Sequence, residues 1–234
     1  MKENIPRFFS AKYNDIYFTP DDPESEKQYV FIEANRVAER IRIAESFTVA
    51  ELGFGFGLNC ALTLHAAKEV DCLHRLNYFS VDENLPPQTD IHALAGKLKL
   101  CRGEYEQLWA SPSPPSPLSQ RERGSLNFPL PLGEGSRVRV GDVLSFLNES
   151  DFTADCWYFD GFSPAKNPGM WSAEVFARAF ALTRPGGTFS TYTSAGWVRR
   201  NLEAAGFVVE KVHGFGSKRE MLTGFKPSSG AERI

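Results

Sequence analysis

The sequence predicts an α/β fold in which a mostly parallel, seven-stranded sheet ends in an antiparallel hairpin. Three observations lead to this prediction. Short apolar runs alternate with segments of helical period, the last two runs lie close together, and 42% of the 234 residues are hydrophobic. A chain of this length and composition can bury one sizeable core, so we expect a single domain over residues 1–234.

The expected strands are apolar or aromatic runs, and the expected helices are the longer runs between them. In chain order these runs are FTVAEL, LNCALTLHAAKEV, LNYFSV, VRV with its helix DVLSFL, DCWYFD, SAEVFARAFALT, GTFSTYT and WVRRNLEAAG. FVVEKV and REMLTGF follow, joined by HGFGSK, which is too short for a crossover helix. These two runs must pair antiparallel. That strand plan is typical of class I methyltransferases, whereas a dinucleotide dehydrogenase would be expected to continue parallel.

Residues 111–137, SPSPPSPLSQRERGSLNFPLPLGEGSR, interrupt this alternation. They are rich in Pro, Ser and Gly and show neither a helical nor a strand period. Loops of this length are uncommon inside compact domains, so we expect a disordered, low-complexity insert. A lid over the active site is the alternative.

Charge and cysteine spacing exclude several classes of protein. Because the formal net charge is -3, any nucleic-acid site must be a local basic patch. The four cysteines form no CxxC pair, and no histidine lies beside them at ligand spacing, so neither a metal site nor a disulfide framework is expected. The sequence shows no export signal and no apolar run long enough to span a bilayer, which predicts a cytoplasmic protein without membrane binding.

Three glycines, Gly53, Gly55 and Gly57, follow the first strand, with Glu51 two residues before the first of them. A dinucleotide-binding turn requires G-x-G-x-x-G, a spacing that these glycines do not satisfy. They still permit positive φ and let a ligand approach the main chain. The ligand that fits such a turn without a pyrophosphate is S-adenosylmethionine, whose ammonium group Glu51 would bind directly or through water. A purely structural turn is the alternative.

Acidic residues also end or follow two further strands. Asp82 ends LNYFSV, where a carboxylate can accept both ribose hydroxyls, and Glu83 is the rival for that role. Asp142 comes at a strand-to-helix junction. It is predicted either to cap the helix or to accept a hydrogen bond from the adenine amino group.

Asp160 is delivered by the run DCWYFD into the loop DGFSPAKNPGMW. Acids at the carboxyl ends of parallel strands point into the ligand crevice of this fold. The prolines of the loop stiffen it, and Phe162 and Trp171 offer faces on which a base could stack. A rigid connection with a buried tryptophan anchor is the alternative.

Several long stretches together resemble a known family. They are YNDIYFT, YVFIEANRVAERI, VAELGFGFGLN, DGFSPAKNPGMW, RPGGTFSTYTSAGWVRRNLEAAGF and GFGSKREML. They resemble the methyltransferase half of the bifunctional bacterial enzymes that complete the 5-methylaminomethyl-2-thiouridine modification of the tRNA wobble position. The resemblance implies S-adenosylmethionine-dependent methylation of the aminomethyl group at position 5 of that uridine, a Rossmann-like fold, and the tRNA anticodon stem-loop as partner. The family's oxidase half has no counterpart in the sequence, so no flavin is expected and an oxidase partner would be a separate chain.

The resemblance also implies a set of site residues. Asp160 would face the amine as the catalytic residue. The cofactor-binding residues would be Glu33, Asn35, Glu51, Gly53, Gly55, Gly57, Asp82 and Asp142. The substrate-binding residues, chosen for local charge or stacking, are Phe162, Lys166, Trp171, Arg199, Lys218 and Arg219, where Arg199 is alternatively part of a solvated helix face.

The chemistry of methyl transfer poses a problem for Asp160. The reaction mainly requires a neutral amine nitrogen aligned with the methyl carbon. A primary alkylamine is largely protonated at neutral pH, and although burial disfavours the charged form, a nearby carboxylate favours it. We therefore expect Asp160 to orient the N–H bonds and to stabilise the charge that grows on nitrogen. The alternative functions are methylation of a small amine or amide, and an inactive RNA-binding remnant damaged by the insert.

Overall fold

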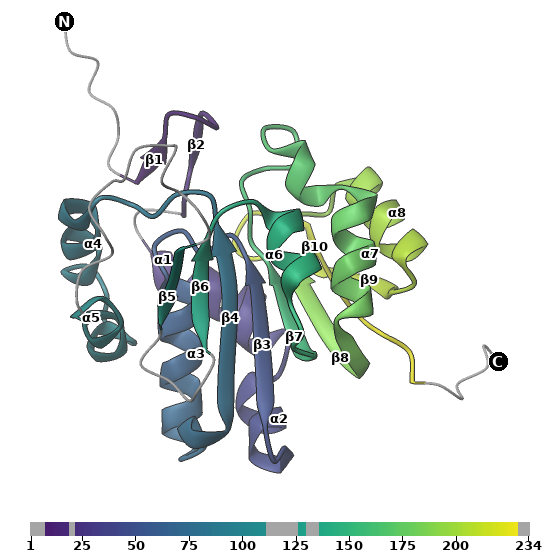
Figure 1. Ribbon diagram of the computed structural model, residues 1–234. Helices are drawn as coiled ribbons and strands as arrows, with labels where there is room; N and C mark the ends of the chain where they lie inside the picture. The colour runs from purple at the N-terminus through teal and green to yellow at the C-terminus, as the bar shows by residue number, and fades with distance from the viewer. Residues whose placement is uncertain (1–7, 19–21, 111–125, 130–135, 229–234) are drawn as a thin grey trace, which may run out of the picture.

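The computed structural model describes residues 8–18, 22–110, 126–129 and 136–228. Within them, one sheet has eight strands in the order β5-β6-β4-β3-β7-β8-β10-β9, and β1 and β2 form a separate hairpin (Figure 1). The strands are β1 (Phe9–Ser10), β2 (Asp15–Ile16), β3 (Phe47–Leu52), β4 (Leu76–Asp82), β5 (Leu126–Pro129), β6 (Arg137–Val140), β7 (Ala154–Phe159), β8 (Thr183–Thr191), β9 (Val208–His213) and β10 (Glu220–Phe225).

Strands β6, β4, β3, β7 and β8 pair in parallel, whereas β10 pairs antiparallel with both β8 and β9. This arrangement confirms the predicted mostly parallel sheet of seven strands with a terminal antiparallel hairpin. Strand β5 adds an eighth, antiparallel strand at the edge beside β6.

Strand β5 lies inside the insert predicted for residues 111–137. The prediction that this segment lacks regular structure is wrong for residues 126–129, and also for Arg137, where β6 begins. The outer edge of β6 would otherwise leave N–H and C=O groups unpaired, and a short strand of any composition can satisfy them. The rest of the insert, residues 111–125 and 130–135, lies outside the described residues.

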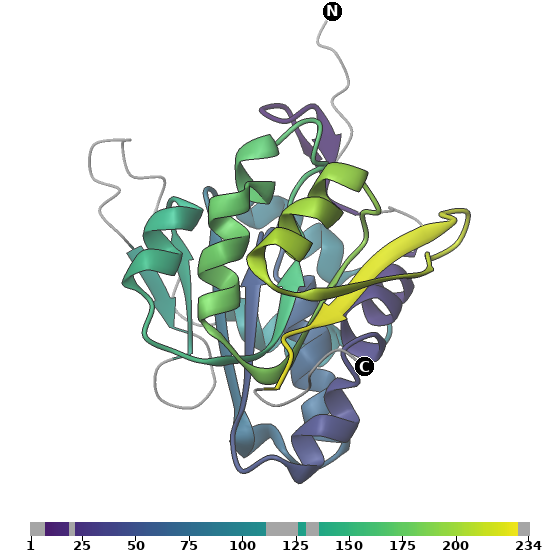
Figure 2. The same ribbon diagram turned by 90° about the vertical axis from the view of Figure 1, so that its right-hand side faces the viewer.

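Helices cover both faces of the sheet (Figures 1 and 2). One face carries α1 (Pro23–Lys27), the π-helical turn η1 (Gln28–Glu33), α2 (Val37–Ile43), α3 (Leu58–Glu69), α4 (Gln88–Ala95) and α5 (Arg102–Ala110). The opposite face carries α6 (Val143–Glu149), α7 (Ala173–Ala181) and α8 (Gly196–Ala205). Two short 3₁₀ turns, η2 (Leu73–Arg75) and η3 (Pro168–Trp171), join these elements.

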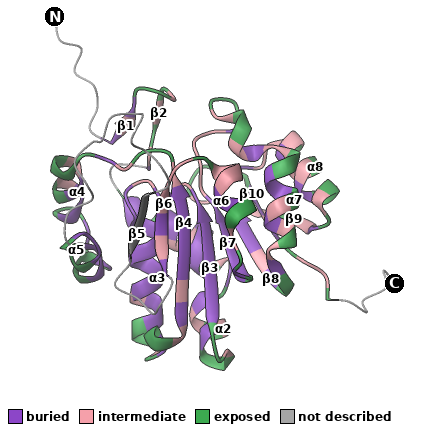
Figure 3. Cartoon of the chain, viewed as in Figure 1, coloured by how far each residue is buried: buried purple, intermediate pink, exposed green. Residues whose placement is uncertain are grey.

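The central strands are buried along their whole length. Every residue of β3 and of β7 is buried, as Figure 3 shows. This burial follows from the two layers of helices, because a strand covered on both faces needs a continuous apolar run rather than an alternating one. The polar residues Glu51 and Asp155 in these strands are therefore exceptions that require hydrogen-bond partners.

Candidate functional site

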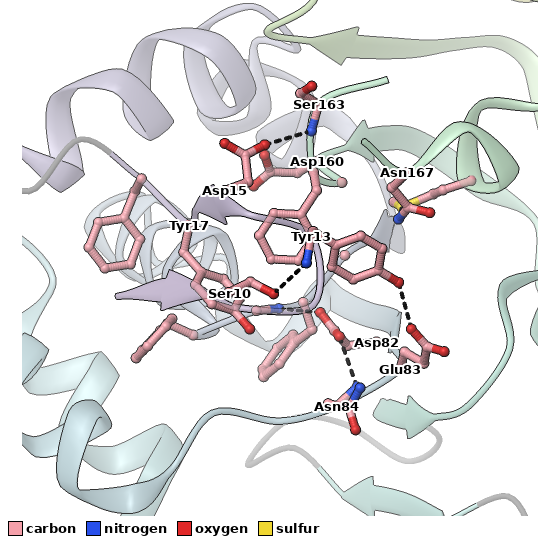
Figure 4. Close-up of a pocket in the computed structure, with 18 of the residues that line it drawn as sticks. Ser10, Tyr13, Asp15, Tyr17, Asp82, Glu83, Asn84, Asp160, Ser163 and Asn167 are labelled. Atoms are coloured by element: carbon pink, nitrogen blue, oxygen red, sulfur yellow. Dashed lines mark hydrogen bonds between the residues drawn. The ribbon is translucent and has the colours of Figure 1, made fainter. Parts of the chain in front are cut away.

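A cavity of about 930 Å³ lies at the carboxyl ends of β3, β4 and β7, and hairpin β1–β2 forms part of its wall (Figure 4). Its volume is in the range of small-molecule and cofactor sites. Of the residues predicted to form the site, Asp160, Gly53, Gly55, Asp82, Asp142, Phe162 and Lys218 line this cavity.

The three glycines all have positive φ, but for different reasons. A Cβ on Gly53 would lie 2.3 Å from the backbone oxygen of Asp160, and a Cβ on Gly57 would lie 2.8 Å from the ring of Phe54. Gly55 lines the cavity, and its Cβ position is 3.2 Å from the ring of Tyr17. Gly57 does not line the cavity, so the prediction that it contacts the cofactor is not supported: it begins α3 under a layer of apolar side chains.

Asp82 fastens the glycine turn. Its carboxylate accepts from the backbone N–H of Gly55 at 2.7 Å and from that of Asn84 at 3.1 Å. Burial raises the pKa of Asp82 to about 6, against the lowering effect of these backbone donors. The rival residue, Glu83, instead accepts from Lys12 and, at 2.6 Å, from the hydroxyl of Tyr13, which ties hairpin β1–β2 to the end of β4.

Asp142 borders the cavity at the start of α6. Its Oδ1 accepts from the backbone N–H of Ser145 at 2.9 Å and from the hydroxyl of the same residue at 3.1 Å. The predicted helix cap is therefore present. The predicted adenine contact stays a proposal for the same carboxylate, which is exposed at the cavity edge.

Asp160 belongs to a buried polar network at the floor of the cavity. Asn59 Nδ2 donates to Asp160 Oδ2 at 2.7 Å and to Glu51 Oε1 at 2.8 Å. The ammonium of Lys27 forms an ion pair with the same Asp160 oxygen. Asn59 Oδ1 is buried and has no hydrogen-bond partner among the described residues.

Glu51 lies beneath the cavity rather than in its wall. It is fully buried, and Tyr78 and Ser80 of the neighbouring strand donate to its Oε2 at 3.0 and 2.9 Å. Burial raises the pKa of Glu51 to about 8, with the charge of Asp160 as the second cause. The predicted direct contact of Glu51 with a cofactor ammonium is therefore not supported, because its three side-chain donors already enclose the carboxyl group.

Two more residues predicted to bind the cofactor lie away from the cavity. Glu33 is exposed and borders a different, smaller cavity. Asn35 is buried between η1 and β8, where its side chain donates to Ser190 Oγ at 2.7 Å and accepts from Thr188 Oγ1 at 2.6 Å. Glu33 is the last residue of the π-helical turn and Asn35 follows it, so both side chains lie away from the cavity.

Aromatic residues of the DGFSP loop have separate roles. Phe162 stacks on Tyr13 of the hairpin, with ring centroids 4.6 Å apart, and lines the cavity. Trp171 is buried, and its Nε1 donates to the backbone oxygen of Phe162 at 3.0 Å. The prediction of a stacking face on Trp171 is therefore wrong, and the alternative of a buried anchor is confirmed.

The predicted basic residues are mostly paired. Lys166 bonds to Asp15 at 3.1 Å and so clamps the DGFSP loop to the hairpin, outside the cavity wall. Arg199 pairs with Glu203 one turn along α8 at 3.4 Å, which favours the solvated-face alternative. Lys218 reaches the cavity, binds Glu26 at 2.5 Å and lies over the ring of Tyr192. Arg219 is exposed beside it and does not line the cavity.

Sequence reasoning missed Lys27, Asn59, Tyr13 and Tyr17, all of which line the cavity. Asn59 carried a usable signal, because it lies in the first turn of the helix that follows the glycines. Lys27 carried none, since nothing in its neighbourhood predicts that α1 packs beside the end of β7.

Two absences hold within the described ranges alone. No group of three or more His, Cys, Asp or Glu side chains there could hold a metal ion. No described helix is long and apolar enough to span a bilayer.

Comparison with known proteins identifies the kind of domain. A family model described as S-adenosyl-L-methionine-dependent methyltransferase matches residues 124–227. The chain is 39% identical over 227 residues to the tRNA 5-methylaminomethyl-2-thiouridine biosynthesis bifunctional protein MnmC of Ectopseudomonas mendocina. The matched region covers 92% of this chain and 33% of that protein. The family model thus matches residues 124–227, and the similarity to the MnmC protein extends over nearly the whole chain. The MnmC protein of Nitrosospira multiformis is 36% identical over 239 residues, covering 97% of this chain and 37% of the relative.

This methyltransferase domain thus spans about a third of the length of the curated relatives it matches. A solved structure described as MNMC2 from Aquifex aeolicus superposes with a TM-score of 0.71 at 23% identity, covering 96% of this chain and 68% of that one. At this identity the similarity supports the fold alone, which agrees with the predicted class I methyltransferase architecture.

Proposed function

We propose that this methyltransferase domain uses S-adenosylmethionine to methylate the aminomethyl group at position 5 of the tRNA wobble uridine. The observation that carries the proposal is Asp160, a carboxylate held at the cavity floor by Lys27 and Asn59. The family match supports the cofactor, and the bifunctional relatives, named for 5-methylaminomethyl-2-thiouridine biosynthesis, support the substrate.

The cavity fits the cofactor. Gly53 and Gly55 both line the cavity with positive φ. The bare Cα of Gly53 lets the turn pack against the backbone of Asp160, whereas Gly55 presents its main chain to the cavity beside Tyr17. Asn59 Oδ1, buried without a partner among the described residues, is an acceptor for a cofactor ammonium or a substrate amine. Asp82 and Asp142 border the same space and would hold the ribose and adenine ends. When bound, S-adenosylmethionine supplies an electrophilic methyl group on a sulfonium.

The protein's own contribution is orientation and electrostatics. The Asp160 carboxylate accepts a hydrogen bond from the amine and directs the nitrogen lone pair away from itself. As the new bond forms, positive charge grows on nitrogen, and the fixed carboxylate stabilises it. The methylated nitrogen then loses a proton to water, so this step needs no metal or covalent intermediate.

Substrate recognition would involve aromatic and basic groups at the cavity mouth. The rings of Phe162 and Tyr13 offer a surface for the uracil base, since base–aromatic stacking tolerates any base. Lys218 and the neighbouring exposed Arg219 supply local charge toward the phosphates of the anticodon stem-loop. The reaction requires an aminomethyl uridine, which a preceding reaction on the same base must supply.

The test is transfer of labelled methyl from S-adenosylmethionine to three acceptors under the same conditions. They are tRNA bearing 5-aminomethyluridine at the wobble position, the same tRNA with an unmodified uridine, and free aminomethyluridine nucleoside. We expect transfer to the first acceptor only, with one methyl group per tRNA. Equal or faster transfer to the nucleoside would instead favour a small-amine methyltransferase.

A further inference from the structure

The carboxylate of Asp160 is already balanced by a cation. Lys27 and Asp160 form an ion pair in which both side chains are only 9% exposed, and both line the cavity. A buried ion pair is costly to form, because both charges lose water. The arrangement therefore suggests a role beyond stability.

The local fold brings Lys27 to this position. It is the last residue of α1, directly before the π-helical turn η1, and π-turns are often found at functional sites. Its ammonium lies 5.3 Å from the ring centroid of Phe31 in the following turn, and this cation–π contact supports the buried charge.

The other ionisable groups around the pair come from each element that borders it. They are Glu51 from β3, Asp82 from β4, Tyr192 directly after β8, Asp15 from the hairpin, Glu26 from α1 and Lys218 from the β9–β10 loop. Most are satisfied by their own partners: Glu26 by Lys218, Asp15 by Lys166, and Asp82 by backbone N–H groups. Burial raises the pKa of Tyr192, so its hydroxyl stays neutral and donates to the backbone oxygen of Gly161 at 2.8 Å.

An isolated carboxylate would work against the reaction. It would attract the substrate as an ammonium ion, whose nitrogen has no free lone pair and cannot accept a methyl group. Lys27 reduces this difficulty, since its charge offsets part of the attraction of Asp160 for a full ammonium ion and repels a second full cation in the same buried space. The smaller charge that grows on nitrogen during transfer is still stabilised by the carboxylate that accepts its N–H. A neutral amine meets no such repulsion and can still donate an N–H to the carboxylate.

We propose that Lys27 neutralises Asp160 and thereby favours the unprotonated, reactive form of the substrate amine. The proposal rests on the function proposed above. In the reaction the amine lone pair forms the N–CH₃ bond, the electrons of the S–CH₃ bond stay on sulfur, and one proton leaves the nitrogen for water. Lys27 acts through Asp160 and through its charge, so it is a positioning residue rather than a catalytic one.

The test is the pH profile of single-turnover methyl transfer at saturating S-adenosylmethionine, on tRNA bearing 5-aminomethyluridine, between pH 6 and 9.5. In a partly buried site, one unit charge shifts the pKa of a neighbouring ionisable group by about one unit or more, and here that group is the substrate amine. In Lys27→Met, the rate should therefore fall about tenfold or more at pH 7, recover to within about threefold of the parent at pH 9.5, and show its midpoint at higher pH.

Three further variants separate charge from structure. Lys27→Gln keeps a donor to Asp160 without the charge and should behave like Lys27→Met. It also provides the test if Lys27→Met does not fold. Lys27→Arg restores the charge and should restore the parent midpoint. Lys68→Met makes the same change at an exposed lysine paired with Glu104, away from the cavity, and should leave the profile unchanged.

The outcomes are distinct. A rate that falls by the same factor at every pH in Lys27→Met and Lys27→Gln, with an unmoved midpoint, overturns the proposal for Lys27 and leaves the proposed function intact. If the parent protein transfers no methyl group to this tRNA at any pH, the proposed function fails, and the proposal for Lys27 fails with it.

Discussion

Glu51 and Asp160 are carboxylates at the ends of neighbouring strands, linked through one asparagine, yet their surroundings differ. Glu51 pairs in register with Tyr158, two residues before Asp160. Because side chains alternate along a strand, Asp160 continues the same face about 7 Å further toward the cavity. Glu51 is enclosed by the hydroxyls of Tyr78 and Ser80, whereas Asp160 borders the cavity.

The difference shows how depth along a sheet divides one kind of residue between two roles. The deeper carboxyl group, that of Glu51, has a pKa raised to about 8, and its titration makes the stability of the fold depend on pH. The shallower one keeps an ion-pair partner and faces the cavity. Neutralising each in turn, with a carboxyl-to-amide change of nearly constant shape, separates the two roles.

The largest effect is expected for Asp160→Asn. If the carboxylate orients the amine and stabilises its growing charge, single-turnover methyl transfer should fall by about a hundredfold or more, the size typical of losing one preorganised electrostatic contact. The affinity for S-adenosylmethionine, measured by calorimetry on the same preparation, should change less than about threefold. A variant that transfers methyl at the parent rate would remove Asp160 from the mechanism and erase its difference from Glu51.

The matched change, Glu51→Gln, should alter stability instead of rate. Because the folded-state pKa of Glu51, about 8, lies above the ordinary value of 4.5, its contribution to stability is fully present below pH 4.5. That contribution is lost as pH rises toward 8. The parent protein should therefore lose on the order of 3 kcal/mol of unfolding free energy from this group between pH 5 and 8.

Denaturant unfolding across that range measures the effect. Glu51→Gln carries no titrating group and should flatten this part of the curve, so the variant gains stability relative to the parent as pH rises. Methyl transfer at pH 7 should stay within about threefold of the parent. A pH dependence of stability identical in the two proteins would show that Glu51 does not titrate in this range.

Asn59 joins the two carboxyl groups, so Asn59→Ala should affect both properties at an intermediate level. Loss of its donor leaves Glu51 and Asp160 each without one hydrogen bond, which costs about 1–3 kcal/mol of stability. Transfer should fall about tenfold, because Asp160 keeps Lys27 but loses one constraint on its orientation. A loss of stability with no loss of rate would assign Asn59 to the deeper group alone.

The sequence predicted the parts of this molecule that depend on local pattern. The strands β3, β4 and β7 are largely apolar runs, and the connection between β9 and β10 is too short for anything but a hairpin. Asp82 and Asp160 were predictable as cavity residues because each ends or follows such a strand. Strand β5 was not, since it forms by pairing with the edge of β6 and its own residues show no strand period.

Features that depend on packing between distant segments were missed or misplaced. The enclosure of Glu51 depends on Tyr78 and Ser80 of the neighbouring strand, and the cation beside Asp160 comes from a short helix 133 positions earlier. Trp171 reads like a stacking platform in the sequence, but it is buried behind Phe162. Such contacts follow from tertiary structure, which no spacing of residue types along the chain encodes.

The smallest effect is expected for Ser80→Ala, which tests whether the deeper carboxyl group is isolated from catalysis. The Ser80 hydroxyl donates to Glu51 Oε2 at 2.9 Å and does not touch Asp160. Because this bond favours the charged carboxylate, its loss should raise the pKa of Glu51 further and cost about 1 kcal/mol of stability, more at pH 9 than at pH 6.

Methyl transfer by Ser80→Ala should stay within about twofold of the parent, because Asn59 still fixes the orientation of Asp160. Unfolding at both pH values and single-turnover transfer at pH 7 measure the two effects. A tenfold loss of transfer would show that the hydroxyls around Glu51 control the reacting carboxylate, and the division between a structural and a catalytic acid would have to be abandoned.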